Sequence, residues 1–284
     1  MPCHGGSMRK LLIPLLAAVG LLAGAATAGA APTSGVNDYS CTPSAQHPEP
    51  VVLVHGLGAN GPLNFATLAP TLAGHGYCVF YLTYGTGILG PTVGGLKPME
   101  DSAAELGAFV DRVRAATGAA KVDIVGHSEG STVPAYYLKF LGGAAKVTHF
   151  VGFGANYAGT SLDGLATLAT LLHLGPALAG VGCASCAEYL PGSEFLTRLD
   201  AGGVAVPGPT YTNIVSKYDT VVTPYTSGVF TAPNATNIVL QDHCSLDFTG
   251  HLGQAVDPNV ASFVLNALDP SSPVRCQPFF DPGA

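Results

Sequence analysis

The segment Gly126-His127-Ser128-Glu129-Gly130 is the feature that most constrains the fold of this chain. It matches the pattern G-x-S-x-G, follows a β-branched run at residues 122–125 and precedes an apolar helical pattern at residues 133–141. A serine between two glycines at such a junction is typical of a tight, strained turn, because side chains at the glycine positions would clash with the neighbouring strand and helix. The segment therefore predicts a strand–turn–helix unit that exposes the Ser128 hydroxyl.

Strand and helix patterns alternate along the rest of the chain. The helix that ends before Gly118 is expected to begin with a capping box formed by Ser102 and Glu105. Such alternation predicts an α/β fold with a mostly parallel sheet and helices on both faces. Further strands are predicted at residues 51–54, 79–84, 147–152, 212–216 and 237–240, and further helices at residues 65–72, 102–117 and 259–268.

An insertion at about residues 156–209 interrupts the succession of strands. It contains an apolar stretch with hardly a charge, made of Leu162, Leu165, Leu168, Leu171, Leu172, Leu174 and Leu178. Two interpretations stay open. The stretch is either a buried core helix, or a lid or acyl-binding wall that offers apolar surface to a lipid interface.

The N-terminal residues predict a targeting segment. Arg9 and Lys10 precede an apolar run at residues 11–22 and a small-residue run with Ala-x-Ala sites, which together indicate a secretory signal peptide over residues 1–30. The apolar run is shorter than the roughly 20 residues that a membrane span needs, and Pro14 and Gly20 interrupt it, so no stable membrane anchor is expected. Residues 31–284 then form one secreted, extracellular domain.

Charge and cysteine content agree with export. With 11 Lys and Arg against 18 Asp and Glu, the chain has no basic surplus for binding nucleic acid. The cysteines that follow residue 30 are even in number and suit three disulfides, for which fifteen pairings exist. Joining neighbours in sequence gives Cys41–Cys78, Cys183–Cys186 and Cys244–Cys276. The alternative for Cys183 and Cys186 is half of a zinc site or a redox motif.

A serine hydroxyl becomes a good nucleophile only beside a base that a carboxylate orients. In this architecture the expected chain order is serine, acid, histidine. His251 lies between the last predicted strand and the last predicted helix, as the base should, and His243 is its rival. Asp219 follows the strand at residues 212–216 and is the predicted acid. The alternative acids are Asp200, Asp242 and Asp247, and the other histidines after Ser128, predicted to be structural, are His149 and His173.

Two backbone N–H groups should stabilise the negative charge that develops when the serine attacks an ester. One is expected at Glu129, directly after the serine, and the other at Leu57, in a glycine-containing loop after the first strand. The His55 side chain in that loop is expected to be a structural hydrogen bonder. The sequence at residues 85–90 also matches G-x-G-x-x-G, but Pro91 and the glycines after it leave no helix N-terminus for a dinucleotide, so a loop is predicted.

Four segments in order carry a resemblance to a known family: residues 51–61, 126–130, 213–219 and 250–253. Together the chain resembles a secreted actinobacterial class 2 lipase of the α/β-hydrolase superfamily. The resemblance implies that Ser128, Asp219 and His251 hydrolyse carboxylic esters, acylglycerols among them, at a lipid–water interface without cofactor or metal. Three alternatives stay open: an acyltransferase of the cell envelope, a carboxylesterase restricted to short-chain esters, and a non-catalytic binding module.

Overall fold

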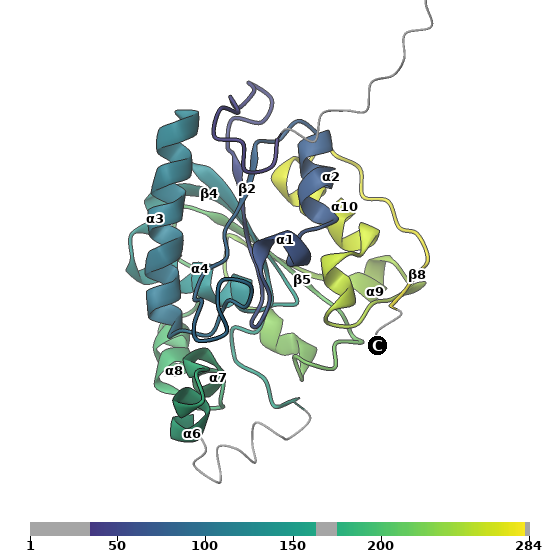
Figure 1. Cartoon of the computed structure of the whole chain (residues 1–284). Coiled ribbons are helices and arrows are strands. Elements are labelled where there is room, and N and C mark those ends of the chain that lie inside the picture. Colours follow the sequence, from purple (N-terminus) through teal and green to yellow (C-terminus); the bar gives the residue numbers. More distant parts are fainter. Residues whose placement is uncertain (1–34, 163–174, 282–284) are drawn as a thin grey trace, which may run out of the picture. The chain divides into compact units, whose positions relative to one another are not determined.

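The computed structural model describes residues 35–162 and 175–281 (Figure 1). The expected signal peptide at residues 1–30, His173 and the leucines from Leu165 to Leu174 lie outside the described residues. The described chain is built on a six-stranded sheet with the order β2-β1-β3-β4-β5-β6, and every neighbouring pair is parallel, as predicted. The strands are β1 (Val51–Val54), β2 (Val79–Tyr81), β3 (Val122–His127), β4 (Val147–Phe153), β5 (Thr210–Val215) and β6 (Ala235–Val239).

Helices cover both faces of the sheet, which confirms the α/β prediction (Figure 1). One face packs on α3 (Met99–Thr117) and α4 (Glu129–Phe140), the other on α2 (Leu68–Gly74) and α10 (Pro258–Leu268). Side chains alternate between the faces along each strand. In β1, Val52 and Val54 therefore belong to the core under α3 and α4, whereas Val51 and Leu53 belong to the core under α2 and α10.

Shorter elements complete the described chain. They are α1 (Gly61–Asn64), α6 (Gly175–Gly180), α7 (Ala184–Glu188), α8 (Glu194–Asp200), α9 (Leu240–His243), the 3-10 turns η1 (Gly143–Ala145), η3 (Tyr225–Gly228) and η4 (Gly253–Ala255), and the small parallel pair β7 (Asp247–Phe248) and β8 (Phe279–Phe280). The helices α6, α7 and α8 lie in the described part of the predicted insertion.

The predicted capping box at Ser102 and Glu105 is wrong. Helix α3 begins at Met99, directly after Pro98, and Ser102 is buried inside the helix. The first N–H group of helix α3, that of Met99, donates to the carboxylate of Glu188, which lies 2.7 Å away in the insertion. The cap is therefore a tertiary contact, which no local pattern could indicate, and Glu105 instead accepts hydrogen bonds from the Gly85 N–H and Lys97.

Three disulfides join the cysteine pairs predicted from their order in the chain. The Cα–Cα distances are 5.9 Å for Cys41–Cys78, 5.3 Å for Cys183–Cys186 and 5.2 Å for Cys244–Cys276. A search of the described residues finds no helix with the length and apolarity needed to cross a membrane. It also finds no cluster of three or more His, Cys, Asp or Glu side chains suited to a metal ion.

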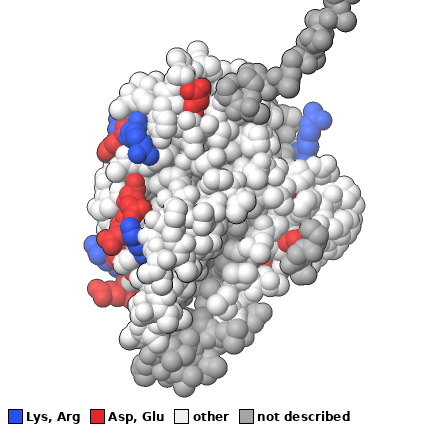
Figure 2. Space-filling view, viewed as in Figure 1, with Lys and Arg blue, Asp and Glu red and all other residues white. Residues whose placement is uncertain are grey.

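Charged side chains are sparse on the face seen in Figure 2. They gather mainly over α3, where Lys97 pairs with Glu105, and Asp111 pairs with both Arg114 and Lys146. Most of the remaining visible surface carries no charge, in line with the 10% of charged residues in the sequence. The ion pairs therefore lie on a solvated helix face.

Candidate active site

Ser128 lies in a strained turn between β3 and α4. Its backbone has φ 56° and ψ −124°, a conformation that non-glycine residues rarely adopt. The two flanking glycines are required by close approach of the backbone. A Cβ atom on Gly126 would overlap with the Gly130 carbonyl, and one on Gly130 would overlap with the Val54 carbonyl in β1. The strand–turn–helix unit is thus as predicted, except that α4 begins at Glu129 rather than at residue 133.

The structure brings together the three side chains selected from the sequence. His251 Nε2 lies 2.9 Å from Ser128 Oγ, and His251 Nδ1 lies 2.7 Å from Asp219 Oδ2. Because a carboxylate only accepts hydrogen bonds, the Nδ1–H group donates to Asp219, which leaves Nε2 without a proton and able to accept the Ser128 hydroxyl. All three residues are buried.

Three further donors hold the Asp219 carboxylate. The backbone N–H groups of Val221 and Val222 donate to Oδ1 over 2.9 Å and 2.7 Å. The buried Gln254 side chain donates from Nε2 to Oδ2 over 3.2 Å, the same oxygen that accepts from His251. Hydrogen bonds of this kind stabilise the charged form of a carboxylate and fix its orientation. Sequence reasoning missed Gln254, which lies in η4. Its position three residues after His251 was the signal that the sequence offered.

The rival residues lie elsewhere and do not line the pocket described below. His243 ends α9, with its ring 5.5 Å from that of Phe263. His149 pairs with Asp123 over 2.9 Å in the sheet, which supports a structural role. Each alternative acid makes other contacts, whereas Asp219 meets the His251 ring: Asp200 ends α8, Asp242 pairs with Lys217, and Asp247 accepts a hydrogen bond from Asn259.

Two buried aspartates hold the loop that carries His251. The Thr249 N–H donates to Asp247 Oδ1 over 2.9 Å, and the Thr249 hydroxyl donates to Asp257 Oδ2 over 2.6 Å. Asn259 bridges the same two carboxyls, donating from Nδ2 to Asp247 and from its backbone N–H to Asp257. Burial, together with the nearby Asp247, raises the pKa of Asp257 to about 7. Four buried polar groups thus fix the backbone two residues before His251.

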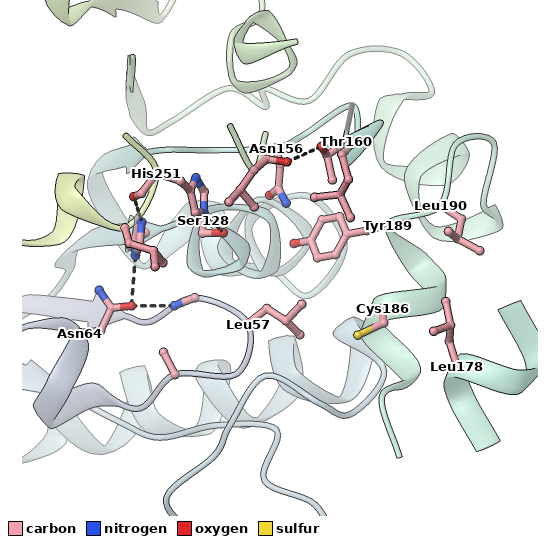
Figure 3. A pocket seen from close by; sticks show the side chains of 16 residues that line it. Leu57, Asn64, Ser128, Asn156, Thr160, Leu178, Cys186, Tyr189, Leu190 and His251 are labelled. Atoms are coloured by element: carbon pink, nitrogen blue, oxygen red, sulfur yellow. Dashed lines mark hydrogen bonds between the residues drawn. The ribbon is translucent and has the colours of Figure 1, made fainter. Parts of the chain in front are cut away.

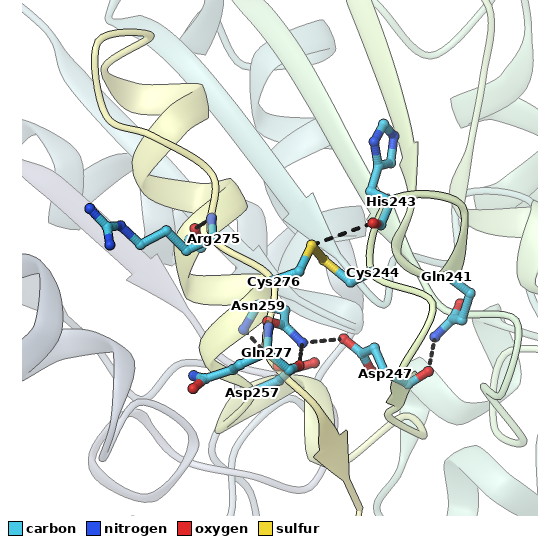
Figure 4. The surroundings of a disulfide bond; sticks show 10 residues. Gln241, His243, Cys244, Asp247, Asp257, Asn259, Arg275, Cys276 and Gln277 are labelled. Carbon is cyan, nitrogen blue, oxygen red and sulfur yellow. Dashed lines mark hydrogen bonds between the residues drawn. A yellow bond between two sulfur atoms is a disulfide. The ribbon is translucent and has the colours of Figure 1, made fainter.

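The Cys244–Cys276 disulfide closes the chain behind this network (Figure 4). Asn259 connects the two features, because it donates from Nδ2 to the Gln277 carbonyl and accepts the Gln277 N–H on Oδ1. The disulfide therefore anchors the C-terminal segment against the network that supports the His251 loop.

Hydrogen bonds orient the loop that contains Leu57. His55 Nδ1 lies 2.8 Å from the Gly56 carbonyl, and His55 Nε2 accepts the Tyr84 N–H over 3.3 Å. Both contacts require a neutral ring with its proton on Nδ1, and burial lowers the pKa of His55 to about 4. The Gly56 carbonyl and the Leu57 N–H belong to one trans peptide and point in opposite directions. By holding the carbonyl, His55 directs the Leu57 N–H away from its own ring.

Among the described residues, no hydrogen-bond partner is found for either predicted oxyanion donor. The Glu129 N–H is the first of α4 and has no partner within the helix. In the described part of the chain neither this group nor the Leu57 N–H donates to a backbone carbonyl. Gly56 lies directly against Ser128, since a Cβ on Gly56 would be 3.1 Å from the Ser128 Cβ. The residues that carry the two predicted donors therefore adjoin Ser128, because Glu129 follows it in sequence and Leu57 follows Gly56.

His127 and Asn64 connect this loop to His251, a role that sequence reasoning missed. Asn64 Oδ1 accepts the Gly56 N–H over 3.0 Å and lies 3.1 Å from His127 Nδ1 (Figure 3). His127 Nε2 lies 3.1 Å from the His251 carbonyl. Burial, reinforced by His251, lowers the pKa of His127 to about 3, so the ring is neutral and its single N–H donates to one of these two oxygens while the ring packs between the two loops.

Ser128 and His251 form one side of a pocket of about 440 Å³ (Figure 3). The opposite side comes from the insertion, with side chains in and around α6 and α7. Leu162 and Leu178, the described ends of the leucine stretch, both line the pocket. The lining residues from the insertion are Asn156, Thr160, Leu162, Leu178, Cys186, Tyr189 and Leu190. The pocket thus presents a largely apolar wall to the Ser128 hydroxyl.

The parallel sheet, the serine in a strand–helix turn and the acid and histidine after later strands define an α/β-hydrolase. A family model described as "Lipase (class 2)" matches residues 48–263, and the chain belongs to this family. Membership places it among the lipases and esterases.

Solved structures of lipases and esterases share the fold. Aspergillus fumigatus lipase B superposes with a TM-score of 0.64 at 18% identity, over 83% of this chain and 57% of that protein, so the chain spans little more than half of that relative. The mature form of the Bacillus licheniformis lipase BlEst2 gives a TM-score of 0.58 at 18% identity, over 79% of this chain and 92% of that one. An esterase from Exiguobacterium antarcticum gives 0.51 at 17% identity, over 78% and 91%.

Proposed function

We propose that the protein is a secreted serine hydrolase that cleaves the carboxylic esters of acylglycerols through Ser128, His251 and Asp219. The observation that carries the proposal is the continuous row of hydrogen bonds from Ser128 Oγ through His251 to Asp219 at the edge of an apolar pocket. A non-catalytic binding module has no need for a buried, strained serine beside an unprotonated imidazole nitrogen.

The reaction proceeds through an acyl-enzyme. His251 Nε2 takes the proton from Ser128 Oγ while the oxygen attacks the ester carbonyl, and Asp219 stabilises the resulting imidazolium. The N–H groups of Leu57 and Glu129 donate to the oxyanion of the tetrahedral intermediate. His251 then gives its proton to the departing alcohol, and the acyl group remains on Ser128. Water attacks this ester with His251 again acting as base, which releases the carboxylic acid.

The pocket wall supports long acyl chains as substrates. Its side chains from the insertion are mainly apolar, and burying each methylene of an acyl chain against such a wall contributes about 0.8 kcal/mol. Three disulfides support export, since disulfides persist mainly in oxidising compartments. The apolar leader at residues 1–30 supports the same conclusion.

Ser128→Ala and a matched pair of histidine variants test the proposal. Ser128→Ala and His251→Asn should lower kcat for p-nitrophenyl esters by about 10⁶-fold, and Ser128→Ala should lose labelling by a fluorophosphonate. His243→Asn, which alters the rival histidine outside the pocket, should leave kcat within about twofold. Circular dichroism checks that each variant is folded. Substantial turnover by folded Ser128→Ala would refute the mechanism, and a preference for acetate over octanoate esters would refute the acylglycerol assignment.

A further inference from the structure

We propose that the Glu129 side chain is a neutral carboxylic acid that ties the two halves of the oxyanion hole together, and that its ionisation inactivates the hole. The inference rests on the proposed function, because it assigns a positioning role within the same site. The Glu129 side chain is fully buried, and the mechanism above does not use it.

The donors and acceptors around the Glu129 carboxyl indicate that this group carries a proton. The Tyr84 hydroxyl lies 3.2 Å from Glu129 Oε1 and 2.7 Å from the His55 carbonyl. A phenol has one proton, and the shorter bond assigns it to the carbonyl. Ser185, the other hydroxyl beside the Glu129 carboxyl, donates its proton to the Gly95 carbonyl over 2.5 Å. Tyr189, the third hydroxyl that faces the carboxyl, interacts with Thr132 and Asn156. With Tyr84 and Ser185 donating elsewhere, Glu129 is the donor to Tyr84.

The surroundings offer no charge that would stabilise a carboxylate. No Lys or Arg of the described residues pairs with Glu129. The ionisable groups that face it are Tyr84 after β2, Tyr189 after α7 and the Glu188 carboxyl in α7. His55, which stacks on Tyr84, is held neutral. Burial, with a further contribution from Glu188, raises the pKa of Glu129 well above its usual range.

The neutral carboxyl links the two oxyanion donors through two hydrogen bonds. It donates to Tyr84, and Tyr84 donates to the His55 carbonyl. That carbonyl shares a peptide with the Gly56 N–H, which Asn64 holds, so the peptide before the Leu57 donor is fixed at both ends. If Glu129 ionised, it could no longer donate a hydrogen bond to Tyr84. It would also bring a negative charge next to the place where the oxyanion forms, in a site of low dielectric.

Substitution by glutamine separates this role from simple packing. Glu129→Gln keeps the shape and replaces the side-chain O–H donor by an amide N–H that does not ionise, whereas Glu129→Leu removes the side-chain donor altogether. Each protein is compared with itself, as the ratio of kcat/KM at alkaline pH to kcat/KM at pH 7. We expect an alkaline decrease of about tenfold in the wild type and a ratio near one in Glu129→Gln. In Glu129→Leu we expect kcat to be low at every pH, with KM little changed.

Infrared spectroscopy gives a readout that needs no turnover. The wild-type spectrum at pH 7 should contain the C=O band of a buried carboxylic acid that is missing from Glu129→Gln. If Glu129→Gln does not fold, Tyr84→Phe should shift this band, because it removes the hydrogen-bond acceptor. Parallel alkaline limbs in the wild type and Glu129→Gln, or the absence of the band, would overturn the inference. A wild type that shows the band but hydrolyses no ester would overturn the proposed function instead.

Discussion

Removing the disulfides one at a time should cost more stability for a long closed loop than for a short one. Cys244–Cys276 joins residues 32 positions apart, and Cys183–Cys186 joins residues three positions apart. In the chain-entropy model a cross-link destabilises the unfolded chain as the logarithm of loop length. With these separations the model gives about 4 kcal/mol for the long loop and about 2 kcal/mol for the short one. The expected difference is about 2 kcal/mol.

The two double alanine variants, C244A/C276A and C183A/C186A, allow a matched comparison, because each replaces two half-cystines. Urea unfolding at pH 7, followed by circular dichroism, gives the free energy of unfolding of each. The long-loop variant should also lose kcat well below its unfolding temperature, since its disulfide supports the loop that carries His251. Equal losses of stability, or a larger loss in the short-loop variant, would refute the entropic reasoning.

Three further predictions follow from the site. Gly130→Ala should lower the free energy of unfolding by at least about 3 kcal/mol in urea titrations, because its Cβ would overlap with the Val54 carbonyl. Gln254→Leu should lower kcat/KM for p-nitrophenyl esters about tenfold by removing a donor from Asp219; an unchanged value would contradict this role. His55 has a pKa of about 4 when folded against 6.5 when unfolded, so its stabilising effect is full above pH 6.5 and is lost as the pH falls towards 4. The difference in unfolding free energy between wild type and His55→Asn should therefore shrink by about 3 kcal/mol between pH 7 and pH 4, and a constant difference would contradict the low pKa.

The sheet and the row of three side chains could be predicted because their signals are local. Ser128 follows β3 directly and Asp219 follows β5 after a short loop, whereas His251 comes after β6, beyond α9 and β7. In a parallel sheet the carboxyl ends of the strands lie at one edge, so residues at those ends converge whatever their separation in sequence. Knowing the order of strands was therefore enough to bring the three together.

The features that escaped prediction depend on contacts between distant segments. Glu188 caps α3 from a helix 89 residues away, and Asn64 meets His127 across 63 residues. Neither side chain has a local pattern that distinguishes it from a surface residue. The Glu129 proton is likewise set by Tyr84, 45 residues earlier, and by burial. Propensity and periodicity describe the chain near a residue, whereas these roles are defined by what packs against it.

Ser128, Asp219 and His251 come from separate parts of the chain, and this separation determines what an activity assay measures. Ser128 and His251 are 123 residues apart, and Asp219 and His251 are 32 apart, so any fragment that holds the full row also contains β4, β5 and β6. Parallel strands pair only after a crossover, and such non-local contacts form late in folding. Under the proposed function, ester hydrolysis is a measure of completed folding. In a purified sample it counts the molecules with an assembled sheet, rather than the total amount of chain.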